Sequence, residues 1–302
     1  MDLRMKERAQ NTKLPEQAFT LYDQFAHGRI NRREFMSGLT KLAVGSLTAS
    51  SIMAALMPNY ANAEQVSFND PDIKATYQHF DSPKGNGQCR GYRVEPANLS
   101  QSAPIILVIH ENRGLNPYIK DVTRRLAKAG FIAFAPDGLF PVGGYPGNDE
   151  QGKAMQRDMD GEKLKQDFFA AAAMLKGDSK GHGKVGAVGF CYGGGMVNKL
   201  VTEQPDVISA AVPFYGAAPD LTKVKNIKAP LLIHMGELDE WVNAMWPDYE
   251  TALKDNNKSY QAYIYPNARH GFHNDSTPRF DKEQAELAWQ RTLTFFHQHL
   301  KA

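Results

Sequence analysis

The chain is poor in cysteine and tryptophan, lacks an uninterrupted apolar run of bilayer length, and is almost neutral. It has 2 cysteines and 3 tryptophans in 302 residues, and 35 Lys and Arg against 33 Asp and Glu give a net charge of +2. Two cysteines are too few for a disulfide scaffold. A near-neutral balance argues against a nucleic-acid-binding surface. The hydrophobic share of 42% is typical of a globular protein with one large domain or two small ones.

The first 63 residues have the layout of an export signal. Arg32 and Arg33 stand side by side, a phenylalanine follows two positions later, and a mildly apolar stretch runs from Leu39 to Met57. The tripeptide Ala61-Asn62-Ala63 then offers the small-x-small pattern that signal peptidases cut. This order resembles a twin-arginine export signal. Lys41 and several Ser and Thr residues interrupt the apolar stretch, which makes it too polar for a bilayer span.

We therefore expect residues 1–63 to be a leader recognised by the export machinery, residues 64–302 to form the mature domain, and the protein to be periplasmic or exported. An amphipathic N-terminal helix of a cytoplasmic protein fits the same residues, and so does an uncleaved signal anchor. The leader also departs from the short positive start of such signals, because about 30 mixed-charge residues precede the arginines. No oligomeric state follows from the sequence.

The pentapeptide Gly189-Phe-Cys191-Tyr-Gly193 is the most informative motif in the chain. It follows a short β-prone run and precedes a run that fits a helix. Such a turn forms the nucleophile elbow, in which the glycines let neighbouring backbone pass without a Cβ clash. The sulfur of Cys191 would then stand at a helix N-terminus, where the dipole favours a thiolate. A buried, inert cysteine is the alternative. A disulfide to Cys89 is not expected, because it would consume the nucleophile.

From residue 104 onward, apolar strands alternate with helices. Strands are expected at 105–109, 131–135, 185–190, 208–214, 230–235 and 260–265, with an edge strand at 88–95. Helices are expected from residue 117, over 164–175, after the elbow, over 242–253 and over 282–299, while the charge-rich region 145–162 should begin as a loop. This alternation predicts an α/β fold with a mostly parallel sheet and helices on both faces. Ligands in such sheets bind beyond the carboxyl ends of the strands.

Reactive side chains follow three further strands, at the same edge of the sheet as the elbow. They are Glu111, Asn112 and Arg113 after strand 105–109, Asp239 after strand 230–235, and His270 after strand 260–265. A nucleophile, an acid and a histidine in this chain order are typical of the α/β-hydrolase fold. We therefore expect Cys191 to attack a carbonyl as a thiolate, His270 to handle its proton and Asp239 to hold the imidazole.

Backbone N–H groups are expected to hold the developing oxyanion. The first belongs to Tyr192, the residue after the nucleophile, and the second comes from the loop after strand 105–109, where we choose Asn112. Arg113 in that loop fits a solvated cation as well as a substrate contact. His110 fits a packed strand-end histidine as well as a functional one. This chemistry requires no metal and no organic cofactor.

The acid and the base each have competitors. Asp239 also fits a turn or N-cap residue, with Glu237 or Glu240 as the true acid. His273 competes with His270 for the role of the base. His270 is favoured because it follows the strand directly.

Together these residues resemble those of the dienelactone hydrolases, cysteine-dependent members of the α/β-hydrolase fold, over about residues 80–300. The resemblance rests on Gly189-Phe-Cys191-Tyr-Gly-Gly194, Gly236-Glu-Leu-Asp239, His270-Gly-Phe272, Glu111 and Ala135-Pro-Asp137-Gly. It implies a triad of Cys191, Asp239 and His270. It also implies that Glu111 contacts the nucleophile in the resting enzyme and takes the thiol proton when substrate binds. A thiol held neutral beside a carboxylate is protected from oxidation.

The resemblance implies that the chain hydrolyses a small-molecule ester or lactone through an acyl-enzyme intermediate. Family members that act on dienelactone bind its carboxylate with arginines, one of them four residues after the catalytic histidine. This chain has Asn274 there, which counts against dienelactone as the substrate. The other interpretations are a thioesterase or acyltransferase using the same triad, an inactive binding protein of the same fold, and a protein that binds zinc through Cys191, His270, His273, Asp239 and Glu111.

Overall fold

The computed structural model describes residues 14–45, 47–99 and 102–301. The chain divides into two compact units. The first contains the described residues up to Asn59 together with Ser276–Arg279, and the second contains Tyr60–Asp275 and the residues from Phe280 onward. All of the residues that the sequence predicts to be catalytic lie in the second unit.

The second unit is built on one eight-stranded sheet. Its strands are β1 (Ile73–Ser82), β2 (Gly87–Pro96), β3 (Ile105–Ile109), β4 (Ile132–Pro136), β5 (Val185–Phe190), β6 (Ala210–Phe214), β7 (Leu231–Gly236) and β8 (Tyr260–Tyr265). They lie in the order β1-β2-β4-β3-β5-β6-β7-β8. The pairs β1–β2 and β2–β4 are antiparallel, and all the others are parallel. This is the mostly parallel α/β sheet that the sequence predicts.

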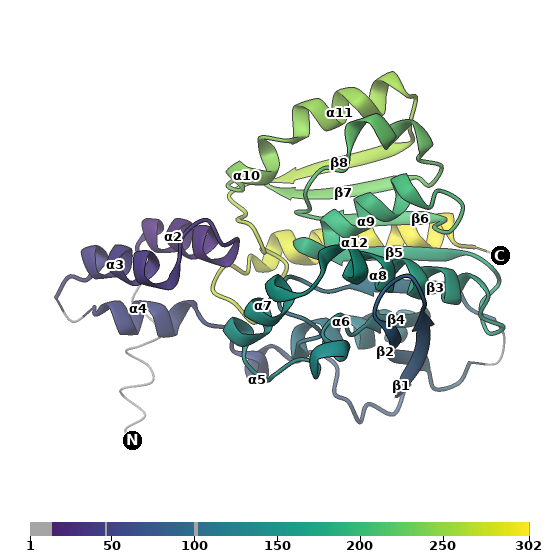
Figure 1. Ribbon diagram of the computed structural model, residues 1–302, viewed down its shortest axis with the longest axis horizontal. Helices are drawn as coiled ribbons and strands as arrows, with labels where there is room; N and C mark the ends of the chain where they lie inside the picture. The colour runs from purple at the N-terminus through teal and green to yellow at the C-terminus, as the bar shows by residue number, and fades with distance from the viewer. Residues whose placement is uncertain (1–13, 46, 100–101, 302) are drawn as a thin grey trace. The chain divides into compact units, whose positions relative to one another are not determined.

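Helices lie on both faces of this sheet (Figure 1). They are α5 (Tyr60–Ala63), α6 (Pro117–Lys128), α7 (Asp149–Asp158), α8 (Gly161–Lys176), α9 (Tyr192–Glu203), α10 (Glu240–Asn243), α11 (Trp246–Asp255) and α12 (Lys282–His299), with 3-10 helices at Phe140–Val142 and Leu221–Asn226. Because side chains alternate along a strand, Gly186 and Phe190 face the same way. Phe190 meets Tyr118 of α6, and Gly186 lies against Phe296 of α12. Helices α6 and α12 therefore cover one face together.

The core is centred on the five inner strands β3 to β7, in which every residue is buried. Continuous apolar runs of this kind are typical of strands covered on both faces. The register aligns their carboxyl ends, since Ile109 pairs with Gly189 and Gly236 pairs with Tyr265. The segments that follow β3, β5, β7 and β8 therefore leave the sheet at the same edge.

Three elements differ from the sequence-based expectation. The edge strand is β1, and β2 lies inside it. In β1 only Ile73, Phe80 and Ser82 are buried, so its sequence carries neither an apolar run nor a regular alternation. Helix α7 occupies the region expected to begin as a loop, and its Gly152 packs against the backbone of Arg113. The helix expected over 242–253 is broken into α10 and α11, with Pro247 in the first turn of α11.

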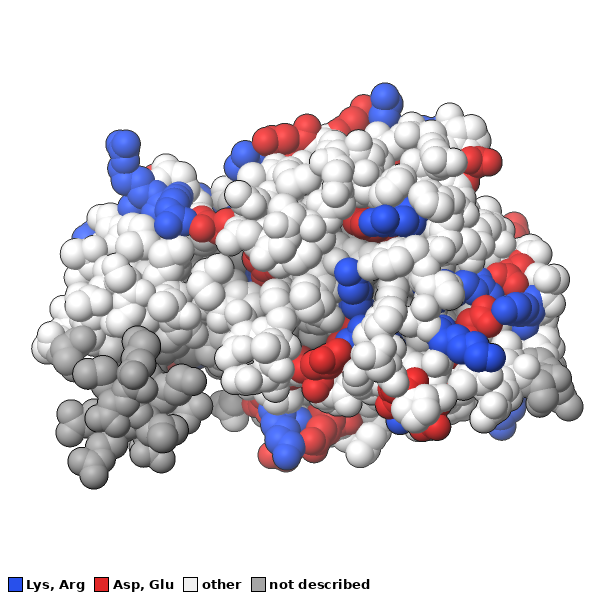
Figure 2. Space-filling view, turned by 90° about the horizontal axis from the view of Figure 1, so that it is seen from below, with Lys and Arg blue, Asp and Glu red and all other residues white. Residues whose placement is uncertain are grey.

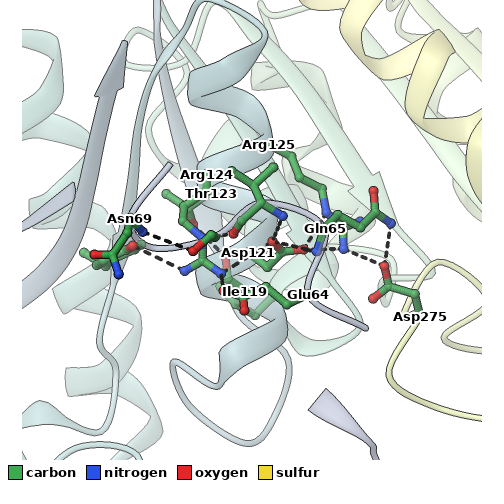
Figure 3. A network of polar contacts seen from close by, with 12 residues as sticks. Glu64, Gln65, Asn69, Ile119, Asp121, Thr123, Arg124, Arg125 and Asp275 are labelled. Atoms are coloured by element: carbon green, nitrogen blue, oxygen red, sulfur yellow. Dashed lines mark hydrogen bonds and ion pairs between the residues drawn. The ribbon is translucent and has the colours of Figure 1, made fainter. Parts of the chain in front are cut away.

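Helix α6 connects the segment after α5 to the loop after β8 (Figure 3). Asp121 accepts hydrogen bonds from the backbone of Gln65 and Val66, and Arg125 forms an ion pair with Asp275 at 2.5 Å. Cavities of about 320 and 310 Å³ flank residues 63–64, and neither lining includes Cys191 or His270. This network is therefore structural, and it fixes the end of the segment that carries His270.

The first unit has its own small core. Its helices are α2 (Glu16–Ala26), α3 (Arg32–Leu42) and α4 (Ala49–Leu56). Tyr22, Phe35 and Ile52 are buried among them, and Arg279 pairs with Asp23 at 2.7 Å while lying over the Tyr22 ring. None of the helices in the described ranges combines the length and the apolar character that crossing a bilayer requires.

Charge is mixed on the surface. On the face seen in Figure 2, blue Lys and Arg side chains lie among red Asp and Glu side chains. Ion pairs in the structure include those of Lys128 with Asp70 and Asp72, and of Lys180 with Glu95. The near-neutral composition is thus reflected on this face.

Candidate active site

Strand β5 ends in a strained turn at Cys191. The residue has φ 56° and ψ −112°, and helix α9 begins immediately after it. Such angles in a residue other than glycine cost about 1–3 kcal/mol and persist only where the surroundings enforce them. A Cβ on Gly189 would lie 2.2 Å from the carbonyl oxygen of Gly193, and a Cβ on Gly193 would lie 2.1 Å from that of Ile109. Only glycine fits these two positions, so the elbow predicted from the sequence is present.

Asp239 and His270 form a buried pair. His270 Nδ1 donates to Asp239 Oδ2 at 2.6 Å, and each side chain is 4% exposed. Asp239 is also the N-cap of α10, because its Oδ1 accepts from the backbone of Val242. It therefore caps a helix and also holds His270. With Nδ1 bonded to the carboxylate, Nε2 is the ring nitrogen that could serve a reacting group.

The sulfur of Cys191 lies beside His270. It is within 4.8 Å of a ring nitrogen of His270. Burial alone would lower the pKa of His270, but the charges and hydrogen bonds of Asp239 and Cys191 outweigh burial and raise the pKa well above its usual value. A raised pKa favours the imidazolium form, which stabilises a neighbouring thiolate.

The competing acids lie apart from this pair. Glu237 is exposed and accepts a hydrogen bond from the backbone of Asn267 at 2.7 Å, and Glu240 is exposed in the first turn of α10. The partner of His270 in the structure is therefore Asp239.

The other two candidate histidines have structural partners. His273 Nδ1 is 2.7 Å from the hydroxyl of Tyr118, and burial followed by the charge of Arg125 lowers the pKa of His273 to about 3. His110 is bonded at both ring nitrogens, since Nδ1 lies 2.6 Å from the carbonyl of Glu111 and Nε2 accepts from the backbone of Gly138. His110 is thus a packed strand-end histidine, and His273 holds its own loop to α6.

Glu111 is buried directly after β3. Its Oε2 accepts a hydrogen bond from Asn274 Nδ2 at 3.0 Å, and the two residues are 2% and 0% exposed. Sequence reasoning identified Asn274 only as a departure from a family pattern and missed this contact. No local signal could have revealed it, because the two residues are 163 positions apart.

Arg113 is a buried cation with a carboxylate partner, and not a solvated one. It is 5% exposed and pairs with Asp149 of α7 at 2.8 Å. The same carboxylate accepts hydrogen bonds from the hydroxyls of Tyr60 and Tyr145. This cluster attaches α7 to the loop that begins with Glu111, which is a structural role.

The two residues expected to supply oxyanion donors lie at the same edge of the sheet. Tyr192 is the first residue of α9, where backbone N–H groups have no partner one turn earlier in the helix. Asn112 is half-buried in the turn after β3. The strands that precede these two residues, β3 and β5, are neighbours in the sheet, and Ile109 at the end of β3 pairs with Gly189 near the end of β5.

Cys89 and Cys191 are both free thiols. Cys89 lies in β2, three strands from β5, and at about 4.8 Å per strand this places the cysteines about 14 Å apart, beyond the reach of a disulfide. Burial, followed by the charges of Asp167 and Asp81, raises the pKa of Cys89 to about 12. A buried thiol with a raised pKa is a poor nucleophile, which counts against Cys89 as a reactive group.

Comparisons with known proteins identify the family. The model of the dienelactone hydrolase family matches residues 89–300. The chain belongs to the dienelactone hydrolase family. It is accordingly a carboxylic ester hydrolase that resembles the carboxymethylenebutenolidases. A second model, described as YqhI-like, matches residues 5–44.

Individual relatives agree with this assignment. An Aquifex aeolicus protein named "Putative carboxymethylenebutenolidase" is 33% identical over 72% of this chain and 96% of its own length. "Putative hydrolase fragment YghX" of Escherichia coli is 57% identical over 38% of this chain and 97% of its own length. Among solved structures, the dienelactone hydrolase-like phosphotriesterase P91 from metagenomic libraries has a TM-score of 0.65 at 21% identity, covering 76% of this chain and all of its own; this likeness shows the shared fold.

Proposed function

We propose that this family member cleaves an ester or lactone with a triad of Cys191, His270 and Asp239, through an acyl-enzyme intermediate. The observation that carries the proposal is the position of His270, whose Nδ1 is bonded to the Asp239 carboxylate and whose ring has a nitrogen within 4.8 Å of the Cys191 sulfur. This is the relation of acid, base and nucleophile on which such catalysis depends.

The proposed reaction has two balanced halves. The thiol of Cys191 loses its proton to a neighbouring base, and the sulfur bonds to the substrate carbonyl carbon. The tetrahedral intermediate collapses as the alkoxide leaves with a proton from His270, giving a thioester. Water then gives a proton to His270 and attacks the thioester, and the sulfur departs as a thiolate while the acid product forms. The thiolate finally takes its proton back from the neighbouring base, which restores the resting enzyme.

The remaining residues support these steps. In the proposal, the backbone N–H groups of Tyr192 and Asn112 hold the oxyanion of both tetrahedral intermediates. Glu111 is the base that accepts the thiol proton when substrate enters. Its buried position at the end of the strand next to β5 supports this role.

The charges of the site favour an uncharged ester or lactone. Asn274 is neutral and donates to Glu111, and Arg113 is paired with Asp149. A substrate carboxylate placed beside Glu111 would meet a like charge with no compensating cation from these two positions. We therefore expect neutral lactones and activated esters to be turned over faster than analogues that carry a carboxylate.

The test is a screen of small esters and lactones with the Cys191→Ala variant as control. The proposal expects activity in the wild type and its loss in the variant, with the melting temperature unchanged. Full activity in Cys191→Ala would remove the cysteine from the mechanism. Transfer of the acyl group to an added alcohol or amine in preference to water would make the enzyme an acyltransferase.

We further propose that the leader directs export. Arg32 and Arg33 are exposed at the start of α3, which supports their being accessible to a receptor. Phe35 is 1% exposed, so α3 would have to unfold before a receptor could bind this side chain. Cell fractionation of the wild type and of an Arg32→Lys, Arg33→Lys variant tests this. The variant should stay in the cytoplasm while the wild type leaves it, and an equal distribution would overturn the proposal.

A further inference from the structure

Asn274 is a buried polar residue that the proposed reaction does not use. Its side chain is completely enclosed, and its amide donates to Glu111 Oε2 at 3.0 Å. A buried carboxylate is costly unless its oxygens accept hydrogen bonds, and a donated hydrogen bond favours the ionised form. Asn274 therefore supplies what an ionised Glu111 needs at this depth.

The backbone fixes where Asn274 stands relative to the base. The backbone N–H of Asn274 donates to the carbonyl oxygen of Gly271, and the backbone N–H of Phe272 donates to the carbonyl oxygen of Arg269. Phe272 and His273 are fully buried, and His273 is bonded to Tyr118 of α6. One rigid turn therefore carries His270 to Asp239 and Asn274 to Glu111.

Glu111 in turn stands beside the elbow. Ile109 and Gly189 are paired across β3 and β5, and Glu111 and Cys191 each lie two residues beyond them. The elbow packs on this segment, since a Cβ on Gly193 would lie 2.8 Å from the carbonyl oxygen of the residue before Glu111. A charge on Glu111 is thus placed to act on the sulfur.

Resting on the proposed function of Cys191 as nucleophile, we propose that Asn274 is a positioning residue that keeps Glu111 ionised and in place, and through that charge sets how readily Cys191 releases its proton. Titratable groups from several elements lie near this pair, among them Tyr215 directly after β6, whose ring centroid is 5.0 Å from that of His270. Tyr118 of α6 has a pKa raised by burial and by the charges of Tyr215 and Glu111. Cys191 comes from the elbow, and His270 and His273 come from the turn.

The proposal fixes different outcomes for two substitutions. Asn274→Leu removes the donor, so Glu111 takes up a proton more readily, the negative charge beside the sulfur falls, and the thiolate forms at lower pH. The displacement should be about one pH unit, as expected for one hydrogen bond to a charged group. Asn274→Asp has nearly the same shape and places a second carboxyl group beside Glu111. Two buried carboxyl groups at this distance share one proton, so the pair keeps a single negative charge and the thiolate should form near the wild-type pH.

The experiment measures the alkylation rate of Cys191 by iodoacetamide as a function of pH, with peptide mass spectrometry to separate it from buried Cys89. Asn198→Leu is the matched control, because Asn198 is also a buried amide and donates to a backbone carbonyl. Its profile should coincide with that of the wild type. In a Glu111→Gln background, Asn274→Leu should produce no further displacement.

An Asn274→Asp profile displaced as far as that of Asn274→Leu would overturn the proposal, as would an unchanged profile in Asn274→Leu or a Leu effect that survives in Glu111→Gln. If Asn274→Leu fails to fold, Asn274→Ala takes its place, because it also removes the donor: a downward displacement supports the proposal and an unchanged profile overturns it. Alkylation needs no substrate, so these results are independent of whether Cys191→Ala abolishes hydrolysis.

Discussion

Replacing Asp239 by asparagine should remove most of the activity and leave the fold intact. The carboxylate holds His270 by a 2.6 Å hydrogen bond in an almost fully buried pair. An asparagine amide at that position donates to Nδ1 and favours the tautomer with a proton on Nε2, which cannot accept another from the attacking water. It also removes the charge that raises the pKa of His270.

The size of the effect follows from comparable triads. Loss of tautomer control should lower kcat about a thousandfold or more, which is about 4 kcal/mol of transition-state stabilisation. Stability should change far less, because asparagine is as good an N-cap as aspartate and keeps the bond to Val242. We expect a decrease of no more than about 2 kcal/mol in the free energy of unfolding.

The assay is steady-state hydrolysis of an activated ester together with thermal unfolding. Glu237→Gln is the control, since Glu237 is the neighbouring acid and does not contact His270 in the structure. That variant should retain activity within a factor of about three, as expected for a solvent-exposed charge. A folded Asp239→Asn enzyme with wild-type kcat would refute the assignment of the acid.

Three further results are expected. Gly193→Ala should abolish folding or strongly destabilise the protein, because the added Cβ would lie 2.1 Å from a backbone oxygen. Gly161→Ala is the control and should be tolerated, because its Cβ would lie in open space among the described residues. Equal melting temperatures of the two variants would contradict the elbow geometry. The pKa of His273 is lowered to about 3 in the folded protein, whereas an unfolded histidine titrates near 6.5. The free energy of unfolding of the wild type should therefore fall as the pH drops from 6.5 toward 3, by about 3 kcal/mol at pH 4, and that of His273→Gln should fall less. Parallel acid-unfolding curves of the two proteins would contradict this. Arg279→Ala should make residues 14–59 more sensitive to limited proteolysis, because it removes the ion pair of the buried Arg279 with Asp23. Arg157→Ala is the control and should leave the digestion unchanged, because the pair of Arg157 with Asp158 is exposed. Unchanged digestion of both variants would contradict the packing of the first unit.

The parts of the fold that could be predicted from the sequence are those with a local physical signal. The inner strands are continuous apolar runs, α6 begins with Asn116 capping and Pro117 in the first turn, and the elbow needs glycine at two positions. Strand β1 and helix α7 lack such signals, because their sequences are polar and their positions depend on tertiary contacts. The strand β1 pairs along its whole length with β2, and α7 is attached through Asp149.

Some contacts of the candidate site could likewise be predicted from local sequence signals, and others could not. The order of Cys191, Asp239 and His270 follows from strand ends at one edge of a parallel sheet, so spacing in the sequence was enough to group them. The choice between His270 and His273 depended on which ring meets the carboxylate, and these histidines are only three positions apart. The bond from Asn274 to Glu111 and the pair of Arg113 with Asp149 join distant segments, and only the folded chain reveals them.

The central claim is that Cys191 carries the acyl group during turnover. Rapid acid quench of the enzyme with an activated ester, followed by peptide mass spectrometry, measures this directly. The account predicts the mass of the acyl group on the peptide that contains Cys191, and no adduct on that peptide in Cys191→Ala. Turnover with no adduct on Cys191 at any time before steady state, or an adduct on a different side chain, would contradict it.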